Sequence, residues 1–244
     1  MEENILEVKN LSVGFDGQNI ISELNFSVKK GETLAVIGPN GAGKTVLLRT
    51  LLGILPYSGE IIWRKGVKIG YVPQKLIIEK GFPLSVAEFL RIKGTEAEIE
   101  EAIKKTGVKD KSILEKRLCD LSGGEFQRIM IARALIGNPD ILLFDEPLTG
   151  IDLGGEETIY NLLHKLGESR NVTIILISHD ISVVYKHANN VLCLNKKRFC
   201  YGNPSEVINK TAELYGEMTT LYGQGHSHAT AGHATHLEVE PPSR

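Results

Sequence analysis

The chain has 244 residues, of which 42% are hydrophobic and 24% are charged, and its formal net charge is −2. This length and composition suit one globular domain, or one domain with a sizeable subdomain, around a hydrophobic core. A net charge of −2 argues against a nucleic-acid partner held by a basic surface, so we expect none.

The apolar runs are short. Runs such as 141–144 and 173–177 fall far below the roughly 18–20 residues that cross a bilayer, so any membrane role is expected to be peripheral. Residues 1–4 are acidic and do not resemble a secretory leader. The three cysteines form no CxxC pair, which favours a reduced, cytoplasmic compartment.

The N-terminal segments alternate between apolar and polar residues. Residues 5–15 and 20–28 show this alternation, and Asp16-Gly17 between them suits a tight hairpin turn. The sequence therefore predicts an antiparallel sheet at the start of the chain.

The segment from about 83 to 136 has a helical character. Ser85 with Glu88, and Thr95 with Glu98, fit the capping box that begins a helix. We therefore expect a helical subdomain over 83–136.

After Pro139, strands and helices alternate again. The expected elements are a strand at 141–144, a helix at 156–166, a strand at 172–177 and a helix at 181–188. This alternation predicts an α/β fold with a mostly parallel sheet, interrupted by the helical insertion.

The strongest chemical signal is a glycine-rich loop. It follows the apolar run 33–37, a predicted buried strand, and opens a predicted helix at 46–52. Glycines let the backbone curl around phosphates, Lys44 reaches the outer phosphates and the Thr45 hydroxyl can ligate magnesium. This setting favours a phosphate site over a chance turn, and the loop comprises Gly38, Pro39, Asn40, Gly41, Ala42, Gly43, Lys44 and Thr45.

The run 141–146 ends in two carboxylates. Asp145 is expected at the magnesium ion, because ligands of open α/β sheets gather at the carboxyl ends of the strands. Glu146 is expected to polarise the water that attacks the γ-phosphate. Two solvated acids are an equally good interpretation of the run alone, but the phosphate loop favours the functional one.

A second anion-binding turn precedes the helix expected at 125–136. The N–H groups of Ser122, Gly123 and Gly124 and the serine hydroxyl can receive a phosphate. Ser122 with Glu125 also fits an ordinary capping box, and both interpretations can hold together. Kinases, GTPases and helicases need no such second turn.

These motifs, with Gln74, Asp152 and His179, occur in the order and spacing of ABC ATPases, which the chain resembles over about residues 5–222. The resemblance implies a P-loop ATPase domain over 1–222, with ATP and Mg²⁺ as cofactors. It also implies a homodimer in which the LSGGE turn of one subunit caps the γ-phosphate bound by the other.

Individual roles follow from this resemblance. Phe15 resembles the aromatic that stacks on adenine, with a place in the core as the alternative. Gln74 resembles the residue that senses magnesium or the attacking water, and His179 resembles the switch histidine that orients Glu146. Asp152 matches a loop that crosses the dimer, although the preceding 148–151 departs from the commoner pattern.

The predicted site therefore has three groups of residues. The catalytic residues are Glu146, His179 and Gln74. The ATP-binding residues are the phosphate loop with Phe15, Ser122, Gly123, Gly124, Asp145 and Asp152. The magnesium ligands are Thr45, Gln74 and Asp145.

The chain contains one ATPase unit, with no fused membrane helices and no long coiled coil. The resemblance therefore implies a subunit of a multi-chain importer at the cytoplasmic face of the membrane. Its partners are an integral membrane permease and, indirectly, an extracytoplasmic substrate-binding protein. An ATPase of the iron–sulfur-assembly type is the alternative, as is an importer of another substrate. A nucleotide-gated module without turnover is disfavoured by Glu146 and His179.

Three stretches resemble the branch of the family that takes up zinc, manganese or chelated iron. They are 82–88, 146–152, and 191–195 with 201–204. The apolar residues Leu76, Ile77, Ile78 and Phe82 are expected to dock on the permease or to form an edge of the core.

The segment 223–244 is predicted to be disordered. It contains His226, His228, His233 and His236, which can gather around a metal ion, or can be part of a compositionally biased tail without function. His164 and His187 match no motif and are expected to be structural.

Overall fold

The computed structural model describes residues 3–74, 76, 78, 82–108, 110–146, 161–166, 172–178, 184, 186–195 and 198–207. Asp152, His179 and the predicted histidine-containing tail lie outside the described residues.

The N-terminal sheet is antiparallel and has the strand order β2-β1-β4. Strands β1 (Asn4–Phe15) and β2 (Gln18–Lys29) form the predicted hairpin, and β4 (Ser58–Trp63) pairs with the other edge of β1. The turn residues Asp16 and Gly17 both have positive φ, 50° and 77°, as a type I′ turn requires. The Asp-Gly signal is thereby confirmed.

The central sheet has six strands in the order β5-β6-β7-β3-β8-β9. All its neighbours are parallel except β8 and β9, which confirms the predicted α/β class with a mostly parallel sheet. The strands are β3 (Thr33–Ile37), β5 (Ile69–Val72), β6 (Ile141–Asp145), β7 (Thr173–Ile177), β8 (Asn190–Asn195) and β9 (Arg198–Gly202).

Two helices that follow glycine-rich turns begin earlier than expected. Helix α1 is Lys44–Leu51 rather than 46–52, and α4 is Gly123–Leu135 rather than 125–136. The expected limits followed the apolar periodicity, whereas the helical hydrogen bonds already include the polar or glycine residues that open each helix.

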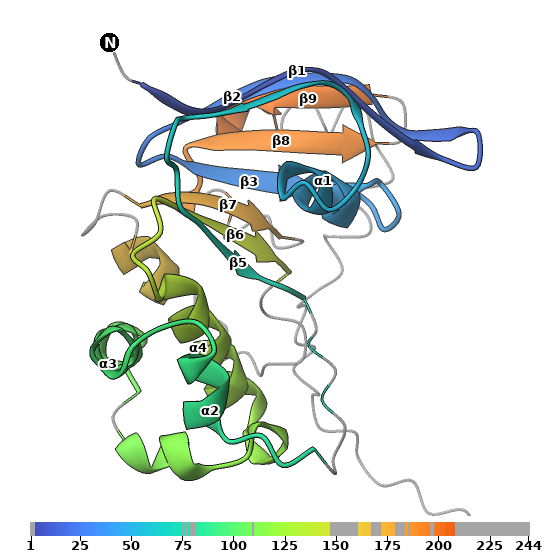
Figure 1. Ribbon diagram of the computed structural model, residues 1–244. Coiled ribbons are helices and arrows are strands. Elements are labelled where there is room, and N and C mark those ends of the chain that lie inside the picture. Colours follow the sequence, from blue (N-terminus) through green and yellow to red (C-terminus); the bar gives the residue numbers. More distant parts are fainter. Residues whose placement is uncertain are drawn as a thin grey trace, which may run out of the picture.

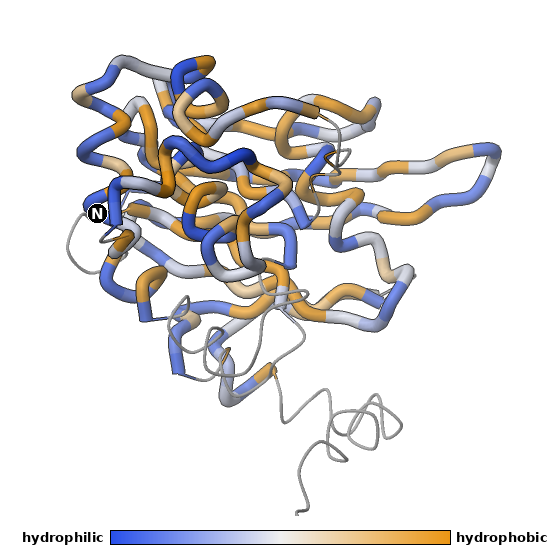
Figure 2. The backbone as a smooth tube through the Cα atoms, turned by 90° about the horizontal axis from the view of Figure 1, so that it is seen from below, coloured by the Kyte–Doolittle hydropathy of each residue, from blue (hydrophilic) through white to orange (hydrophobic). Residues whose placement is uncertain are grey.

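Helices α1 and α4 cover opposite faces of the central sheet (Figure 1). Ile141 and Leu143 of β6 point to one face and pack with α1 and the antiparallel sheet. Leu142 and Phe144 of the same strand point to the other face and pack with α4. Figure 2 shows the hydrophobic segments running through the interior, with hydrophilic ones at the outer turns.

The helices around α4 are short and well capped. Helices α2 (Val86–Arg91) and α3 (Glu96–Lys105) begin with capping boxes at Ser85 and Thr95, which confirms both sequence signals. Two 3₁₀ turns follow, at Lys111–Glu115 and Leu118–Asp120.

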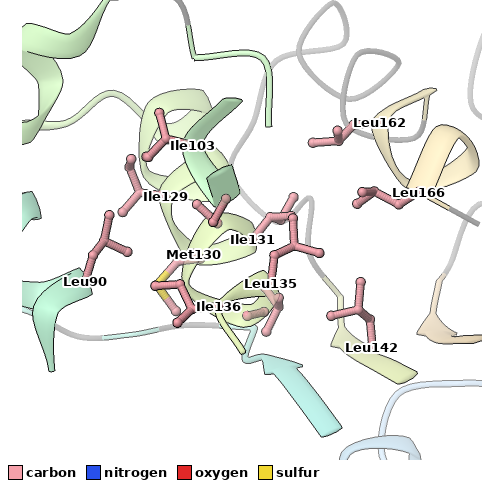
Figure 3. Close-up of a cluster of buried hydrophobic side chains, with 14 of the residues drawn as sticks. Leu90, Ile103, Ile129, Met130, Ile131, Leu135, Ile136, Leu142, Leu162 and Leu166 are labelled. Carbon is pink, nitrogen blue, oxygen red and sulfur yellow. The ribbon is translucent and has the colours of Figure 1, made fainter. Parts of the chain in front are cut away.

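Helix α4 joins this helical group to the sheet. In Figure 3 its side chains lie between Leu90 and Ile103 on one side and Leu142, Leu162 and Leu166 on the other. One apolar cluster therefore fixes the helical group against the sheet face opposite α1.

Candidate functional site

The predicted site residues that the structure describes gather mainly at one edge of the central sheet. Asp145 pairs with Ile177 at the ends of β6 and β7, and Val72 pairs with Phe144 at the ends of β5 and β6. Because these strands are parallel, the residues that follow β3, β5 and β6 all leave the sheet at its carboxyl edge.

The phosphate loop, 38–45, leaves β3 at this edge. Gly38 and Gly43 have φ values of 150° and 99°, which disfavour any residue with a Cβ. A Cβ at Gly38 would collide with the carbonyl oxygen of Leu194, and one at Gly43 would lie 2.9 Å from the Ile20 Cγ2 atom. The loop therefore closes against β8 and β2, and the N-terminal N–H groups of α1 open onto it.

Lys44 is the first residue of α1 and is only 6% exposed. Its Nζ donates hydrogen bonds to the carbonyl oxygens of Gly38 (2.9 Å) and Pro39 (3.2 Å), and lies 3.8 Å from Glu146 Oε1. Burial lowers the pKa of Lys44, against the opposing effect of Glu146 and Asp145. The ammonium is thus held within the loop, between backbone oxygens and a carboxylate.

Thr45 and Asp145 meet across the interface of α1 and β6. The Thr45 hydroxyl donates to Asp145 Oδ1 at 3.0 Å, and Asp145 is 2% exposed. Burial raises the pKa of Asp145, and the hydrogen bond from Thr45 opposes that rise. Two oxygen ligands of the kind that magnesium prefers therefore lie side by side.

Glu146 lies directly beyond the end of β6 and contacts two other predicted site residues. Its Oε2 accepts a 2.6 Å hydrogen bond from Gln74 Nε2, and its Oε1 is the atom near Lys44. Its backbone is left-handed, with φ 48°, a conformation that costs a non-glycine residue about 1–3 kcal/mol. Such an outlier is typical of functional sites, and here it occurs at the residue expected to activate water.

Tyr71 and Arg49 contact this site and were not identified from the sequence. Tyr71 of β5 lies near Asp145 and Arg49, and burial together with the negative charge of Asp145 raises the pKa of the tyrosine. Arg49 lies one helical turn after Thr45, on the same face of α1. The spacing of Thr45 and Arg49 predicts that both side chains lie on one face of a helix, so Arg49 could have been identified from the sequence. Tyr71 could not, because β5 and α1 are far apart in the sequence.

Phe15 ends β1, beside the hairpin turn, and is 37% exposed. This exposure disfavours the alternative that Phe15 is a core residue. Because Ile20 of the same hairpin lies against Gly43, the hairpin reaches the flank of the phosphate loop.

The turn 122–124 is well formed but lies elsewhere in the molecule. Ser122 Oγ accepts from the backbone N–H of Glu125 at 3.3 Å, and Glu125 Oε2 accepts from that of Ser122 at 2.9 Å. Hydrogen bonds from Lys116 and Ser122 lower the pKa of Glu125 to about 2. Since this turn opens α4, and α4 covers the face opposite α1, the turn does not meet its own phosphate loop.

Comparison with known proteins gives consistent matches. Residues 21–149 match the family model described as "ABC transporter". The chain is 39% identical over 225 residues to the "Zinc import ATP-binding protein ZnuC" of Roseobacter denitrificans, covering 91% of this chain and 86% of the relative. It is 43% identical over 211 residues to the "Probable metal transport system ATP-binding protein" of Thermotoga maritima, covering 84% and 87%.

A solved structure agrees with these matches. It is an inward-facing transporter provisionally assigned to the metal-chelate ABC type, and it superposes with a TM-score of 0.77 at 30% identity, covering 87% of this chain and 90% of that one. The phosphate loop, the carboxylates after β6 and these matches lead to one conclusion: the chain belongs to the ATP-binding family of ABC transporters.

Proposed function

We propose that this chain is the ATP-hydrolysing subunit of a multi-subunit importer for a transition metal ion such as zinc or manganese. The observation that carries the proposal is the meeting of Lys44, Gln74 and Glu146 at the carboxyl edge of the sheet, beside Thr45 and Asp145. The zinc and metal transport named for its relatives supports the choice of substrate.

ATP binding is assigned to the phosphate loop and the hairpin. The N–H groups at the start of α1 and the Lys44 ammonium stabilise the negative charge of the phosphates. Phe15 supplies an exposed aromatic face for the adenine beside the loop. The domain that carries these residues is proposed to be 1–222, with the helical subdomain at about 83–136.

Magnesium is assigned to Thr45 and Asp145, directly or through bound water, with Gln74 nearby. Adjacent ligands of an octahedral magnesium ion at about 2.1 Å lie about 3.0 Å apart. The 3.0 Å separation of Thr45 Oγ1 and Asp145 Oδ1 fits that spacing. When bound with ATP, magnesium would neutralise charge on the transferred phosphoryl group.

Replacing Tyr71 with phenylalanine tests how Asp145 is positioned. The ring is retained, but the hydroxyl beside Asp145 is lost. We expect the Mg²⁺ concentration for half-maximal ATP hydrolysis to rise about tenfold, the usual cost of removing a group that orients a metal ligand. Mn²⁺ binding followed by electron paramagnetic resonance should weaken in parallel.

Tyr57→Phe is the matched control, because Tyr57 is 43% exposed in the loop before β4. An unchanged Mg²⁺ dependence and Mn²⁺ affinity in Tyr71→Phe would show that Asp145 does not need the tyrosine.

The hydrolytic step is assigned to Glu146. Its carboxylate accepts a proton from the attacking water, and Gln74 orients that carboxylate through the 2.6 Å hydrogen bond. His179 is proposed to contact the γ-phosphate and to orient Glu146.

A complete site needs a second copy of the chain. Because α1 and α4 cover opposite faces of the sheet, Ser122, Gly123 and Gly124 are proposed to cap the γ-phosphate held by the partner subunit. Asp152 is proposed to contribute to the same interface. In a head-to-tail homodimer with two ATP molecules, each subunit can contribute the 122–124 turn and Asp152 to the interface with its partner.

Among the described residues, no helix is long and apolar enough to span a bilayer. We propose that the subunit works at the cytoplasmic face of the membrane, bound to an integral permease that receives metal from an extracytoplasmic binding protein. Two apolar side chains form the proposed docking patch, Leu76 (40% exposed) and Phe82 (55% exposed). Ile78, by contrast, packs against the core, and Ile77 lies outside the described residues.

Charge introduced into the docking patch should separate transport from catalysis. Leu76→Asp with Phe82→Asp is expected to abolish co-purification with the permease and metal uptake, while soluble ATPase activity stays within about twofold, because exposed positions tolerate substitution. Ile62→Asp, at a 43% exposed position on β4, is the control. Loss of the folded state, seen by circular dichroism, would instead identify the patch as part of the core.

The transport role is tested in cells that lack the gene. Elemental analysis under metal limitation should show a lower content of zinc or manganese, restored by the intact gene. If the content of these metals is unchanged and that of another transported substrate falls, the metal assignment is wrong.

A further inference from the structure

A cavity of about 290 Å³ lies away from the ATP motifs. Its walls come from the start of β3, from β7, from the helical residues 161–166, and from 186–189. Its lining residues on β7, Ile174 and Leu176, point to the sheet face opposite α1. The cavity is therefore on the other side of the sheet from the phosphate loop.

Backbone and side-chain hydrogen bonds hold one wall of this cavity. The Thr33 N–H donates to Asn189 Oδ1 at 2.7 Å, and the Asn189 N–H donates to the Thr33 carbonyl at 2.8 Å. This doubly bonded pair ties 186–189 to the central sheet.

Two histidines from different segments meet in the cavity. The rings of His164 and His187 have centroids 5.0 Å apart and an interplanar angle of 69°. A metal bound at about 2.1 Å by one imidazole nitrogen lies about 3.2 Å from that ring's centre, so two such rings at the tetrahedral angle are about 5 Å apart. The observed separation of the ring centroids therefore allows one metal ion to be shared between the two rings.

The other groups near the two histidines differ in their effect on a bound cation. Burial, with His164 and Lys186 beside it, lowers the pKa of His187, which favours the neutral imidazole that binds metals. Among the described residues, no group of three or more histidine, cysteine or acidic side chains is gathered. The described residues of the cavity therefore offer two nitrogen ligands, those of His164 and His187.

We propose that His164 and His187 form a binding site for a single transition metal ion of the zinc class, separate from the ATP site. Imidazole ligands favour zinc, copper and nickel over calcium and magnesium. With two protein ligands and Lys186 on the same wall, the affinity is expected to be micromolar. This site does not rest on the proposed transport function, because it uses none of the residues assigned to ATP.

The test is calorimetric titration with Zn²⁺ alone, on the full-length chain. The predicted tail ligands would compete, so the starting variant carries glutamine at His226, His228, His233 and His236. We expect one Zn²⁺ per chain, with His164→Gln weakening the affinity by at least about tenfold. His164 is exposed, so its replacement should leave the fold intact.

Two further variants distinguish a metal site from a pair of packed rings. His164→Cys is expected to recover most of the affinity, because thiolate is a good zinc ligand although it cannot stack as imidazole does. Lys186→Gln is expected to strengthen binding several-fold, because it removes a neighbouring positive charge. The proposal is overturned if His164→Gln binds Zn²⁺ as tightly as the starting variant, or if His164→Cys binds no better than His164→Gln.

Discussion

Glu146→Gln is expected to lower ATP turnover by roughly 10²–10⁴-fold while leaving ATP binding intact. Glutamine keeps the shape of the side chain and its contact with Gln74, but it cannot accept the proton of the attacking water. Phosphate release gives the turnover, and calorimetry gives the nucleotide affinity. With ATP bound and hydrolysis blocked, the two-copy complex should accumulate and appear as a doubled mass in light scattering.

Glu60→Gln is the matched control, because Glu60 is exposed on β4 and belongs to none of the ATP motifs. Turnover at the unsubstituted rate in Glu146→Gln would show that another group activates the water. Loss of ATP binding in the same variant would instead assign Glu146 to holding the nucleotide.

Lys44→Ala and Ser122→Arg are each expected to lower turnover by at least about 10²-fold, since each removes a group that stabilises charge on the γ-phosphate. The two substitutions lie at the starts of α1 and α4, which pack on opposite faces of the sheet. A mixture of the variants should therefore form dimers with one intact site and one doubly defective site. ATP-driven dimerisation should recover in part, as measured by light scattering.

Turnover in the mixture can stay low if the two sites must act together, so dimerisation is the decisive quantity. A mixture that dimerises no better than either variant alone would remove the support for a site shared between subunits. Lys44→Ala mixed with a chain that carries both Lys44→Ala and Glu60→Gln tests whether mixing as such restores dimers.

Local signals in the sequence predicted several elements of the fold. Asp16-Gly17 predicted its hairpin because a type I′ turn needs two residues with positive φ. Ser85 and Thr95 predicted the starts of α2 and α3 because the capping box is complete within four residues. The strand 33–37 was predicted because a strand buried on both faces is apolar throughout.

Contacts that depend on the order of the strands in the sheet could not be predicted from the sequence. Parallel pairing joins segments across long crossovers, so nothing near Tyr71 indicates that it reaches Asp145. His164 and His187 were expected to be structural because they match no motif, and their contact arises only when two distant segments pack on the sheet. For Ser122, only the family resemblance predicted a role in the site of a second chain, because no local signal in the sequence indicates where the turn that opens α4 lies relative to its own phosphate loop.

The central claim is that ATP hydrolysis at this site drives metal import, and coupled measurement in membrane vesicles tests it most directly. Vesicles that contain the permease and this subunit should be supplied with ATP on the subunit's side, and metal movement and phosphate release should be followed in the same sample. The account predicts that zinc or manganese moves only while ATP is hydrolysed, and that Glu146→Gln stops both. Metal movement that continues in vesicles carrying Glu146→Gln would contradict it.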